Sequence, residues 1–174
     1  INITLNNFWI DQYQVTNSKY QQYIDAQGVP APEIWPGEDN HPVRGITWDQ
    51  AVAYCRWLNK RLPIEAEWEA AGRGPGPGPQ LYPWGNDATA DGKINTLPDQ
   101  DTYAVGSLTF NESAFGLFDM VGNVWEWVND WYSEAYYQNL PSSNPVGPDS
   151  GSCRSVRGDS WFFYSGSPNA VSLG

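Results

Sequence analysis

The sequence predicts an α+β domain in which two main helices pack on a small twisted antiparallel sheet, with long irregular loops between the elements. Two segments have apolar residues at helical spacing directly after residues that cap helices. The 17 glycines and 14 prolines imply a chain rich in turns, with room for short strands only. At 174 residues the chain is long enough for one domain, and ten Trp, ten Tyr and six Phe supply its core.

The N-terminal part predicts a strand followed by a helix. Residues Ile3–Ile10 alternate loosely between apolar and polar side chains, which favours a strand. The following helix would begin at Thr16 or Asn17, since both residue types cap helices. The buried face of this helix would consist of Tyr20, Tyr23 and Ile24. Residues 28–42 contain four prolines and no periodicity, and therefore predict a loop.

A second and a third helix are predicted in the next thirty residues. Thr47 and Gln50 have the spacing of a capping box. The apolar stripe that follows consists of Ala51, Tyr54, Cys55 and Leu58. Pro63 would open a short helix over Ile64–Ala71, whose early glutamates suit a helix N-terminus. The Gly-Pro tract at 74–79 is interpreted as an exposed loop inside the domain, and a flexible linker is the alternative.

The remainder of the chain predicts turns and short strands, which end over Ser155–Trp161. Within it, Ala114–Val128 combines large aromatic side chains with two acids, Asp119 and Glu126. A core cannot hold such acids unpaired, so backbone amides, an arginine or a cation must accompany them.

Composition narrows the classes of partner and chemistry. The net charge of −11 argues against nucleic acid or an anionic membrane as the main partner. No apolar run approaches the length of a membrane span, so insertion is not expected. Cys55 and Cys153 cannot complete a four-ligand zinc site, and are expected to be two buried thiols, with one disulfide as the alternative. His41, the lone histidine, precedes a proline and is interpreted as structural.

Four motifs carry a family resemblance. They are Arg61–Trp68, Tyr82–Gly85, Gly122–Trp127 and Arg157–Trp161, and they lie in family order. With them the chain, from about Asn7 to Trp161, resembles the formylglycine-generating-enzyme and sulfatase-modifying-factor family. The resemblance implies a single C-type-lectin-like domain over residues 1–174. It does not fix function, because that family includes enzymes and binding proteins.

The resemblance argues against catalysis in this chain. The family's oxidases bind copper with two cysteines whose positions fall near Phe163 and Pro168 here, and copper(I) needs thiolate ligands. The family's iron-dependent sulfoxide synthases take iron ligands from an extra N-terminal helical domain, and one histidine cannot replace them. We therefore expect no catalytic metal and no enzyme activity.

The resemblance also implies structural calcium at two places. Calcium takes six to eight hard oxygens from carboxylates, carbonyls and water. The first set would be Asn95, Thr96, Asp101 and Tyr103. The second would be Asp119, Glu126 and the carbonyls of Gly122 and Val124, and its alternative is capping by backbone amides or by Arg157.

The C-terminal segment 157–174 departs from the family after Trp161. Aromatic residues there stand among Ser, Gly and Asn, which is the composition of antibody binding loops. The segment resembles the variable region of bacterial diversity-generating-retroelement variable proteins, and residues 162–174 contain none of the five residue types that this diversification excludes. The implied ligand contacts are Asp159, Phe162, Phe163, Tyr164, Ser165, Ser167 and Asn169. The alternative is an ordinary loop.

The sequence thus predicts a non-catalytic protein that displays a diversified C-terminal surface to a protein ligand. The alternatives are an oxidase or sulfoxide-synthase-like module without its metal ligands, and an accessory domain of a signalling protein such as a bacterial kinase. Localisation stays open between cytoplasm and cell surface. The oligomeric state and the identity of the ligand are likewise unassigned.

Overall fold

A computed structural model describes residues 2–33, 37–75, 80–87, 101–108 and 110–160. The helices are α1 (Asn17–Gln27), α2 (Trp48–Trp57), α3 (Glu65–Arg73) and the single-turn α4 (Glu134–Tyr137). The strands are β1 (Glu126–Trp131) and β2 (Arg154–Arg157), which pair antiparallel. The predicted α+β class, with helices beside a small antiparallel sheet, is confirmed. Within these residues no helix is both long enough and apolar enough to cross a bilayer.

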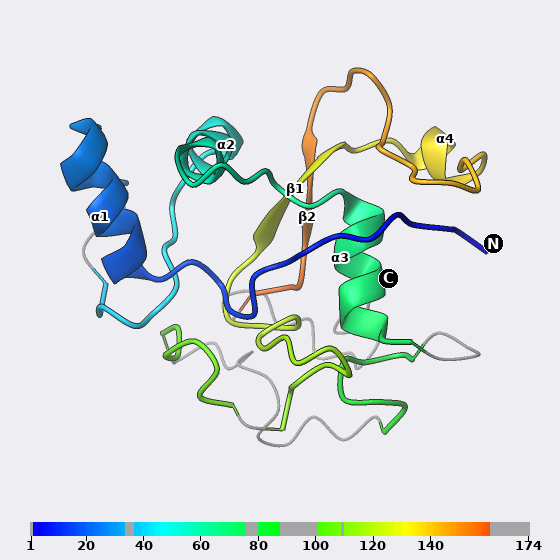
Figure 1. Cartoon of the computed structure of the whole chain (residues 1–174), viewed down its shortest axis with the longest axis horizontal. Helices are drawn as coiled ribbons and strands as arrows, with labels where there is room; N and C mark the ends of the chain where they lie inside the picture. The colour runs from blue at the N-terminus through cyan, green and yellow to red at the C-terminus, as the bar shows by residue number, and fades with distance from the viewer. Residues whose placement is uncertain (1, 34–36, 76–79, 88–100, 109, 161–174) are drawn as a thin grey trace.

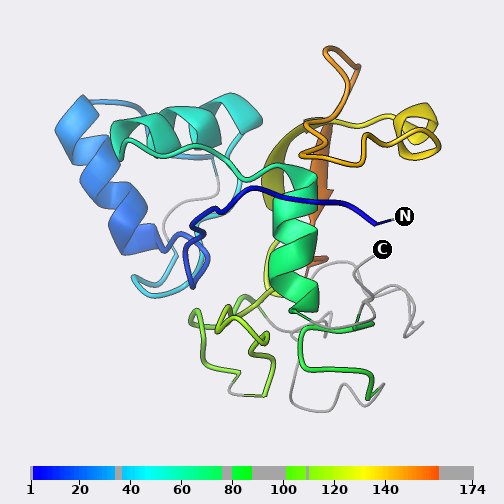
Figure 2. The same ribbon diagram turned by 45° about the vertical axis from the view of Figure 1, so that its right-hand side comes forward.

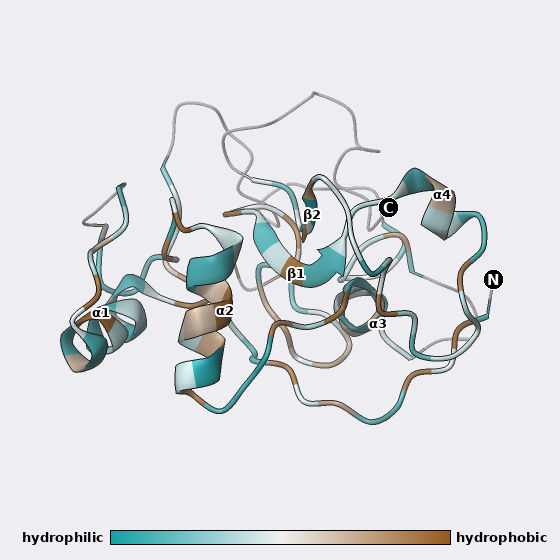
Figure 3. Cartoon of the chain, turned by 90° about the horizontal axis from the view of Figure 1, so that it is seen from above, coloured by the Kyte–Doolittle hydropathy of each residue, from teal (hydrophilic) through white to brown (hydrophobic). Residues whose placement is uncertain are grey.

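The elements lie in one row, with α1 at one end, then α2, the sheet and α3 (Figures 1 and 2). The view from above gives the same order and places α2 between α1 and β1 (Figure 3). Helix α3 packs against both strands, whereas α1 packs against α2. The pairing of the strands puts Glu126 opposite Arg157 and Trp127 opposite Val156.

The helix starts follow the predicted local signals. Thr16 caps α1, with its side chain accepting from the amide of Lys19 at 3.3 Å. Asn17, the alternative cap, instead donates its side-chain amide to the carbonyl of Glu38 at 2.8 Å. At α2 the Thr47 amide donates to Gln50 Oε1 at 2.7 Å and the Gln50 amide to Thr47 Oγ1 at 3.3 Å, which completes the capping box.

The cap of helix α3 comes only in part from its own sequence. Ile64 precedes it and offers no side-chain acceptor. The carboxylate of Glu67 accepts from the Ile64 amide at 3.0 Å, and the carboxylate of Asp130, in β1, accepts from the Glu65 amide at 2.8 Å. The first turn of α3 is therefore fixed by the sheet, which aligns the helix with the strands.

Two aromatic clusters form the core. The central cluster lies between α3 and the sheet and consists of Trp68, Ala71, Tyr82, Leu117, Met120, Val121 and Val128. The helical cluster lies between α1 and α2 and consists of Tyr20, Tyr23, Val43 and Tyr54. The Tyr20 and Tyr54 rings stack at 5.4 Å between centroids. Each cluster gathers enough aromatic area to stabilise its own pair of elements.

The helical cluster is tied to the sheet at one end of α2. The Trp48 indole donates to the Val128 carbonyl at 2.9 Å, and the Trp127 indole to the Ile46 carbonyl at 3.0 Å. Between the Trp48 and Trp131 rings lies the Arg154 guanidinium, 3.6 and 3.7 Å from the two centroids. This cation–π sandwich joins α2, β1 and β2.

The predicted strand Ile3–Ile10 is wrong as a paired strand. In the part of the chain that the structure describes, Thr4 alone of these residues forms a bridge, an isolated one to Ser143. The alternation of side chains is nevertheless kept in part, since Phe8 and Ile10 pack on the central cluster while Trp9 is fully exposed. The predicted alternation is therefore present at residues 8–10, but among the described residues this stretch has no ladder partner.

Candidate functional site

The two acids of the 114–128 stretch lie in one polar site at the start of β1, in which Asp119 is buried and Glu126 is half-buried. Asp119 is 2% exposed, and its carboxylate accepts from the Gly106 amide at 2.6 Å and from the Asn111 side chain at 3.3 Å. The Glu126 carboxylate accepts from the Trp68 indole at 3.1 Å and from Gln14 at 3.0 Å. Every one of these donors is electrically neutral.

Gln14 is the residue that organises this site. Its side-chain nitrogen lies 3.0 Å from Glu126 Oε1, 3.1 Å from the Asp119 carbonyl and 3.3 Å from the Val124 carbonyl. An amide nitrogen has two hydrogens, so three oxygens share two donors. Nothing near Gln14 in the sequence indicates this role, because 112 positions separate it from Glu126.

The electrostatics of the site favour a cation. Burial raises the pKa of Asp119 despite the hydrogen bonds from Gly106 and Asn111. Burial also raises the pKa of Glu126 to about 7, against the hydrogen bonds from Gln14 and Trp68, and the nearby charge of Asp119 raises it further. Two acids that repel each other behind neutral donors are costly to ionise, and a cation between them would remove that cost.

Unused oxygens point to the same chemistry. Gln14 Oε1 and Asn111 Oδ1 are buried without a hydrogen bond among the described residues. Together with the two carboxylates and the Val124 carbonyl, they form an oxygen-rich set of the kind that calcium takes. In the same parts of the chain, no three His, Cys, Asp or Glu side chains converge to hold a metal, so such a site depends on carbonyl and amide oxygens. The donors fit, and the predicted calcium here stays a prediction.

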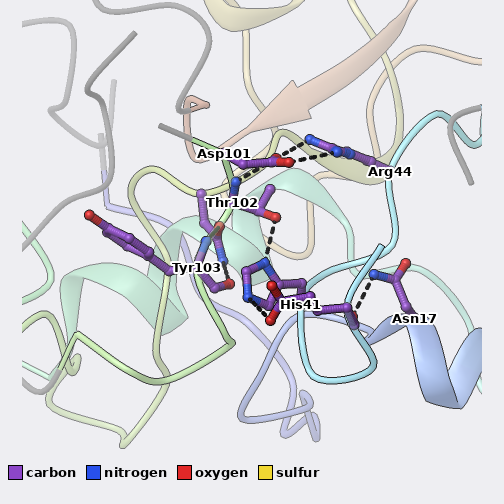
Figure 4. Close-up of polar contacts among 8 residues, drawn as sticks. Asn17, His41, Arg44, Asp101, Thr102 and Tyr103 are labelled. Carbon is purple, nitrogen blue, oxygen red and sulfur yellow. Dashed lines mark hydrogen bonds and ion pairs between the residues drawn. The ribbon is translucent and has the colours of Figure 1, made fainter. Parts of the chain in front are cut away.

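The predicted first calcium set is only half inside the described residues. Asn95 and Thr96 lie outside them. Asp101 faces Arg44, whose two terminal nitrogens donate to its two carboxylate oxygens (Figure 4). Partial burial acts to raise the pKa of Asp101, but the Arg44 hydrogen bonds hold it below its usual range. The Tyr103 carbonyl accepts from the Asn123 side chain at 3.2 Å. An arginine on the carboxylate suits a cation less well than the neutral donors around Glu126 do.

His41 lies in a network beside this ion pair (Figure 4). Its Nδ1 is 2.9 Å from the hydroxyl of Thr102, and its Nε2 is 3.3 Å from the carboxylate of Glu38. Hydroxyl, imidazole and carboxylate thus stand in the order of a hydrolase nucleophile. Thr102, however, is 5% exposed, so its hydroxyl is closed to a substrate. The network joins the loop before α2 to the 101–105 segment, as expected for a structural histidine.

The described end of the chain is held tightly by α3 and by the loop before β1. The Arg157 guanidinium contacts the carboxylates of Glu69 and Glu65, the latter at 3.5 Å. Arg157 thus pairs with these α3 acids, and among the described residues the carboxylate of Glu126 receives its hydrogen bonds from neutral groups. The Gly158 carbonyl accepts from the Gly122 amide at 2.5 Å.

The predicted ligand contacts fall mostly beyond this end. Asp159 is 7% exposed, has a left-handed backbone with φ of 63°, and accepts from the Ser160 amide at 2.7 Å. Burial raises the pKa of Asp159 despite that bond. The other six contacts, Phe162, Phe163, Tyr164, Ser165, Ser167 and Asn169, lie outside the described residues. Their role stays a prediction.

The two cysteines are separate free thiols. Cys55, in α2, is half-buried, and burial raises the pKa of its thiol, with the charge of Asp11 adding to the rise. Cys153 is exposed just before β2, so the expectation of two buried thiols is wrong for this residue. Cys153 follows small polar residues that are typical of a turn. The number of cysteines alone could not predict its exposure.

The sequence of this chain is similar to those of several known proteins. A family model described as Sulfatase-modifying factor enzyme 1-like domain matches residues 1–172. The formylglycine-generating enzyme of Streptomyces coelicolor is 39% identical over 140 residues, which cover 74% of this chain and 44% of that protein. The serine/threonine-protein kinase Pkn1 of Chlamydia trachomatis is 37% identical over 183 residues, which cover 92% of this chain and 29% of that protein. The chain thus spans less than half the length of both relatives.

Among solved structures, Treponema denticola variable protein 1 superposes with a TM-score of 0.78 at 22% identity, over 99% of this chain and 78% of that one. At this identity the likeness establishes the fold, and the predicted C-type-lectin-like architecture is confirmed.

Proposed function

The chain belongs to the sulfatase-modifying factor enzyme 1-like family, and we propose that within it the protein is a non-catalytic ligand-binding domain that presents its C-terminal segment, 157–174, to a protein partner. The observation that carries the proposal is the anchoring of residues 157–160. Arg157 is fixed on two α3 acids and Gly158 on the Gly122 amide, directly ahead of the segment rich in aromatic, Ser and Gly residues. A binding surface gains affinity when its base is rigid, because less conformational freedom is lost on binding.

The absence of a suitable nucleophile or ligand set in the described residues supports a non-catalytic role. The two thiols are free and separate, and the hydroxyl beside His41 is closed to solvent. By the family resemblance, the positions of the oxidases' copper cysteines fall near Phe163 and Pro168, and neither residue is a cysteine. A polar site with raised carboxyl pKa values does exist at Asp119 and Glu126; Asp119 is buried, Glu126 lines a cavity, and neutral donors hold both carboxylates, an arrangement that suits a structural cation.

We also propose that calcium braces this scaffold at the Glu126 site. The carboxylates of Asp119 and Glu126, with the carbonyls of Gly122 and Val124, would hold the ion. Gln14 and Asn111, whose side-chain nitrogens donate to this set, each have a buried oxygen without a hydrogen bond among the described residues. The ion would do no chemistry. It would offset the charge of the two acids. It would also brace the loop whose Gly122 amide donates to the Gly158 carbonyl.

A library experiment tests the display role. The seven predicted contact positions are randomised and displayed on yeast, and a control library randomises seven exposed polar positions on α1 and α2. Both libraries are sorted against one immobilised protein target. Specific binders should come from the first library alone, with melting temperatures near that of the parent. At position 159 the backbone φ of 63° should restrict recovered residues mainly to Asp, Asn and Gly.

Equal recovery of binders from both libraries, or collapse of the fold throughout the first, would contradict the proposal. The DNA around the gene gives an independent answer. A nearby repeat that differs from codons 159–174 only at template adenines would identify those codons as diversified.

The accessory-domain alternative has one observation in its favour, the similarity to the kinase Pkn1 over 92% of this chain. In that case the domain would bind in cis beside a kinase. A kinase reading frame joined to this one in the gene, with no template repeat nearby, would favour it over the display role.

A further inference from the structure

The carboxylate of Asp159 contacts the backbone amide of the very next residue. The Ser160 amide donates to Asp159 Oδ1 at 2.7 Å. An aspartate in a turn ordinarily accepts from an amide two residues further on, which keeps the side chain clear of its own peptide bond. Here the side chain is folded back on that bond. Because Oδ1 is bonded to Cγ, the contact also holds Cγ beside the Ser160 nitrogen.

The surrounding structure keeps this arrangement in place. Asp159 has a left-handed backbone with φ of 63°, which costs an L-aspartate some strain. The preceding Gly158 carbonyl accepts from the Gly122 amide at 2.5 Å, and both Asp159 and Ser160 are buried, with 7% and 6% of their surfaces exposed. Two groups held in contact react faster than the same groups on a mobile chain, because the entropy of bringing them together has already been lost.

The environment of the Asp159 carboxyl favours its neutral form. Burial raises the pKa of this carboxyl, and the hydrogen bond from Ser160 opposes the rise only in part. A neutral carboxyl is the form that reacts with a nitrogen, because its hydroxyl can take up a proton and leave as water. Contact and protonation state therefore both prepare Asp159 for attack by the Ser160 nitrogen.

Asp101 has the same contact in an environment that opposes this reaction. Its Oδ1 accepts from the Thr102 amide at 2.7 Å. Partial burial acts to raise the pKa of Asp101, but the hydrogen bonds from Arg44 hold it below its usual range, so the carboxylate stays ionised. The following residue is β-branched, which crowds the amide nitrogen. Of these two aspartates, Asp159 alone combines the contact with a neutral acid and a small neighbour.

We propose that Asp159 and Ser160 form a modification site, at which the chain closes a succinimide ring on itself. The Ser160 nitrogen forms a bond to Asp159 Cγ, the bond between Cγ and its hydroxyl breaks, and the hydroxyl leaves as water with the amide proton. The reaction needs no oxidant, cofactor or second protein. The ring opens again only by adding water, which the burial of both residues excludes, so the imide accumulates in the folded protein.

The ring changes the base of the C-terminal segment. It removes a buried acid, and it fixes the backbone torsion that precedes the Ser160 nitrogen. For display of segment 157–174, a consequence that rests on the proposed function, the imide is a covalent brace that reduces the freedom lost on binding. The modification itself depends neither on a ligand nor on diversification of the segment.

The chain supplies its own control. Asp149 and Ser150 are the same dipeptide in an exposed stretch, and among the described residues no hydrogen bond joins that amide to the Asp149 carboxylate. The protein is incubated folded and in urea. The imide at each dipeptide is then measured by acidic peptide mapping, as loss of the mass of one water, and by cleavage of the chain with hydroxylamine. In the folded protein residues 159–160 should react at least tenfold faster than residues 149–150, and in urea the two rates should become similar.

Two variants test the chemistry. Asp159→Gly keeps the left-handed backbone without a carboxyl, so it should fold, lose no water at this position and resist hydroxylamine there. Asp159→Asn should close the same ring with loss of ammonia. Equal or faster reaction at Asp149 in the folded protein would overturn the proposal. So would a preference for Asp159 that persists in urea, since the fold would then not be its cause. These readouts need no ligand, so they stand or fall separately from the display role.

Discussion

Asp130 should make the stability of the protein depend on pH in a specific window. The residue lies in β1, is 4% exposed, and accepts from the first amide of α3 at 2.8 Å. Burial raises its pKa from 3.8 to about 6 against that hydrogen bond, and the charges of Glu65 and Glu67 add to the rise. The folded protein therefore binds the Asp130 proton more tightly than the unfolded chain does.

The sign follows from this difference in proton affinity. Between pH 4 and 6 the folded state holds a proton that the unfolded state has released, so the free energy of unfolding falls as the pH rises through the window. A separation of about two pH units corresponds to about 3 kcal/mol, which is lost in full above pH 6. Such a loss is a large part of the stability of a domain of this size.

Urea unfolding of the protein and of Asp130→Asn, from pH 4 to pH 8, measures the effect. Asparagine keeps an oxygen for the Glu65 amide and has no proton to lose, so the variant should gain on the parent by up to about 3 kcal/mol as the pH rises. Asp130→Ala also lacks the titration, and it should be about 1 kcal/mol less stable than Asp130→Asn at every pH because the cap of α3 is gone. A parent–Asn difference that stays constant with pH would refute the reasoning.

Three further perturbations have defined outcomes. Chelation should lower the melting temperature of the parent and calcium should restore it, since an ion bound only to the folded state stabilises that state. The variant Glu126→Gln should respond to neither. Identical calorimetric scans of the parent with and without chelator would contradict the calcium proposal. Arg157→Met should cost about 1 kcal/mol in urea unfolding, because Glu69 loses one of its two arginine partners in a partly exposed setting and keeps Arg73, and an unchanged midpoint would show that the pair contributes nothing. Gly158→Ala should cost about 1–2 kcal/mol, because φ is 93° and the new methyl would lie 3.3 Å from the Met120 carbonyl oxygen; a melting temperature equal to the parent's would count against this tight packing.

The features that the sequence predicted well are those encoded by neighbours in the chain. Thr16 begins α1, and Thr47 with Gln50 begins α2, since the cap and the amide it serves lie within three residues. The need of Asp119 and Glu126 for partners was likewise predictable from their aromatic surroundings. Which partners they have was not, because the donor Gln14 is more than a hundred positions away.

The features that were missed depend on contacts between distant segments. Asp130 caps α3 from 65 positions away, so no spacing rule could connect it with Glu65. The alternation of Ile3–Ile10 indicates a strand correctly as a local preference, yet a strand exists only where a second one pairs with it. Arg157 was a candidate partner for Glu126, and the register of β1 with β2 sets these residues opposite each other, but the α3 acids take the guanidinium.

The separation of the two aromatic clusters has a consequence for how the protein opens. Helices α1 and α2 share their own cluster and are tied to the sheet chiefly at the start of α2, through Trp48, Trp127 and the Arg154 sandwich. The helical pair is thus a cooperative unit that can unfold locally while α3, β1 and β2 stay folded. Residues 157–160 belong to the second unit, so the base of the C-terminal segment keeps its shape during such openings.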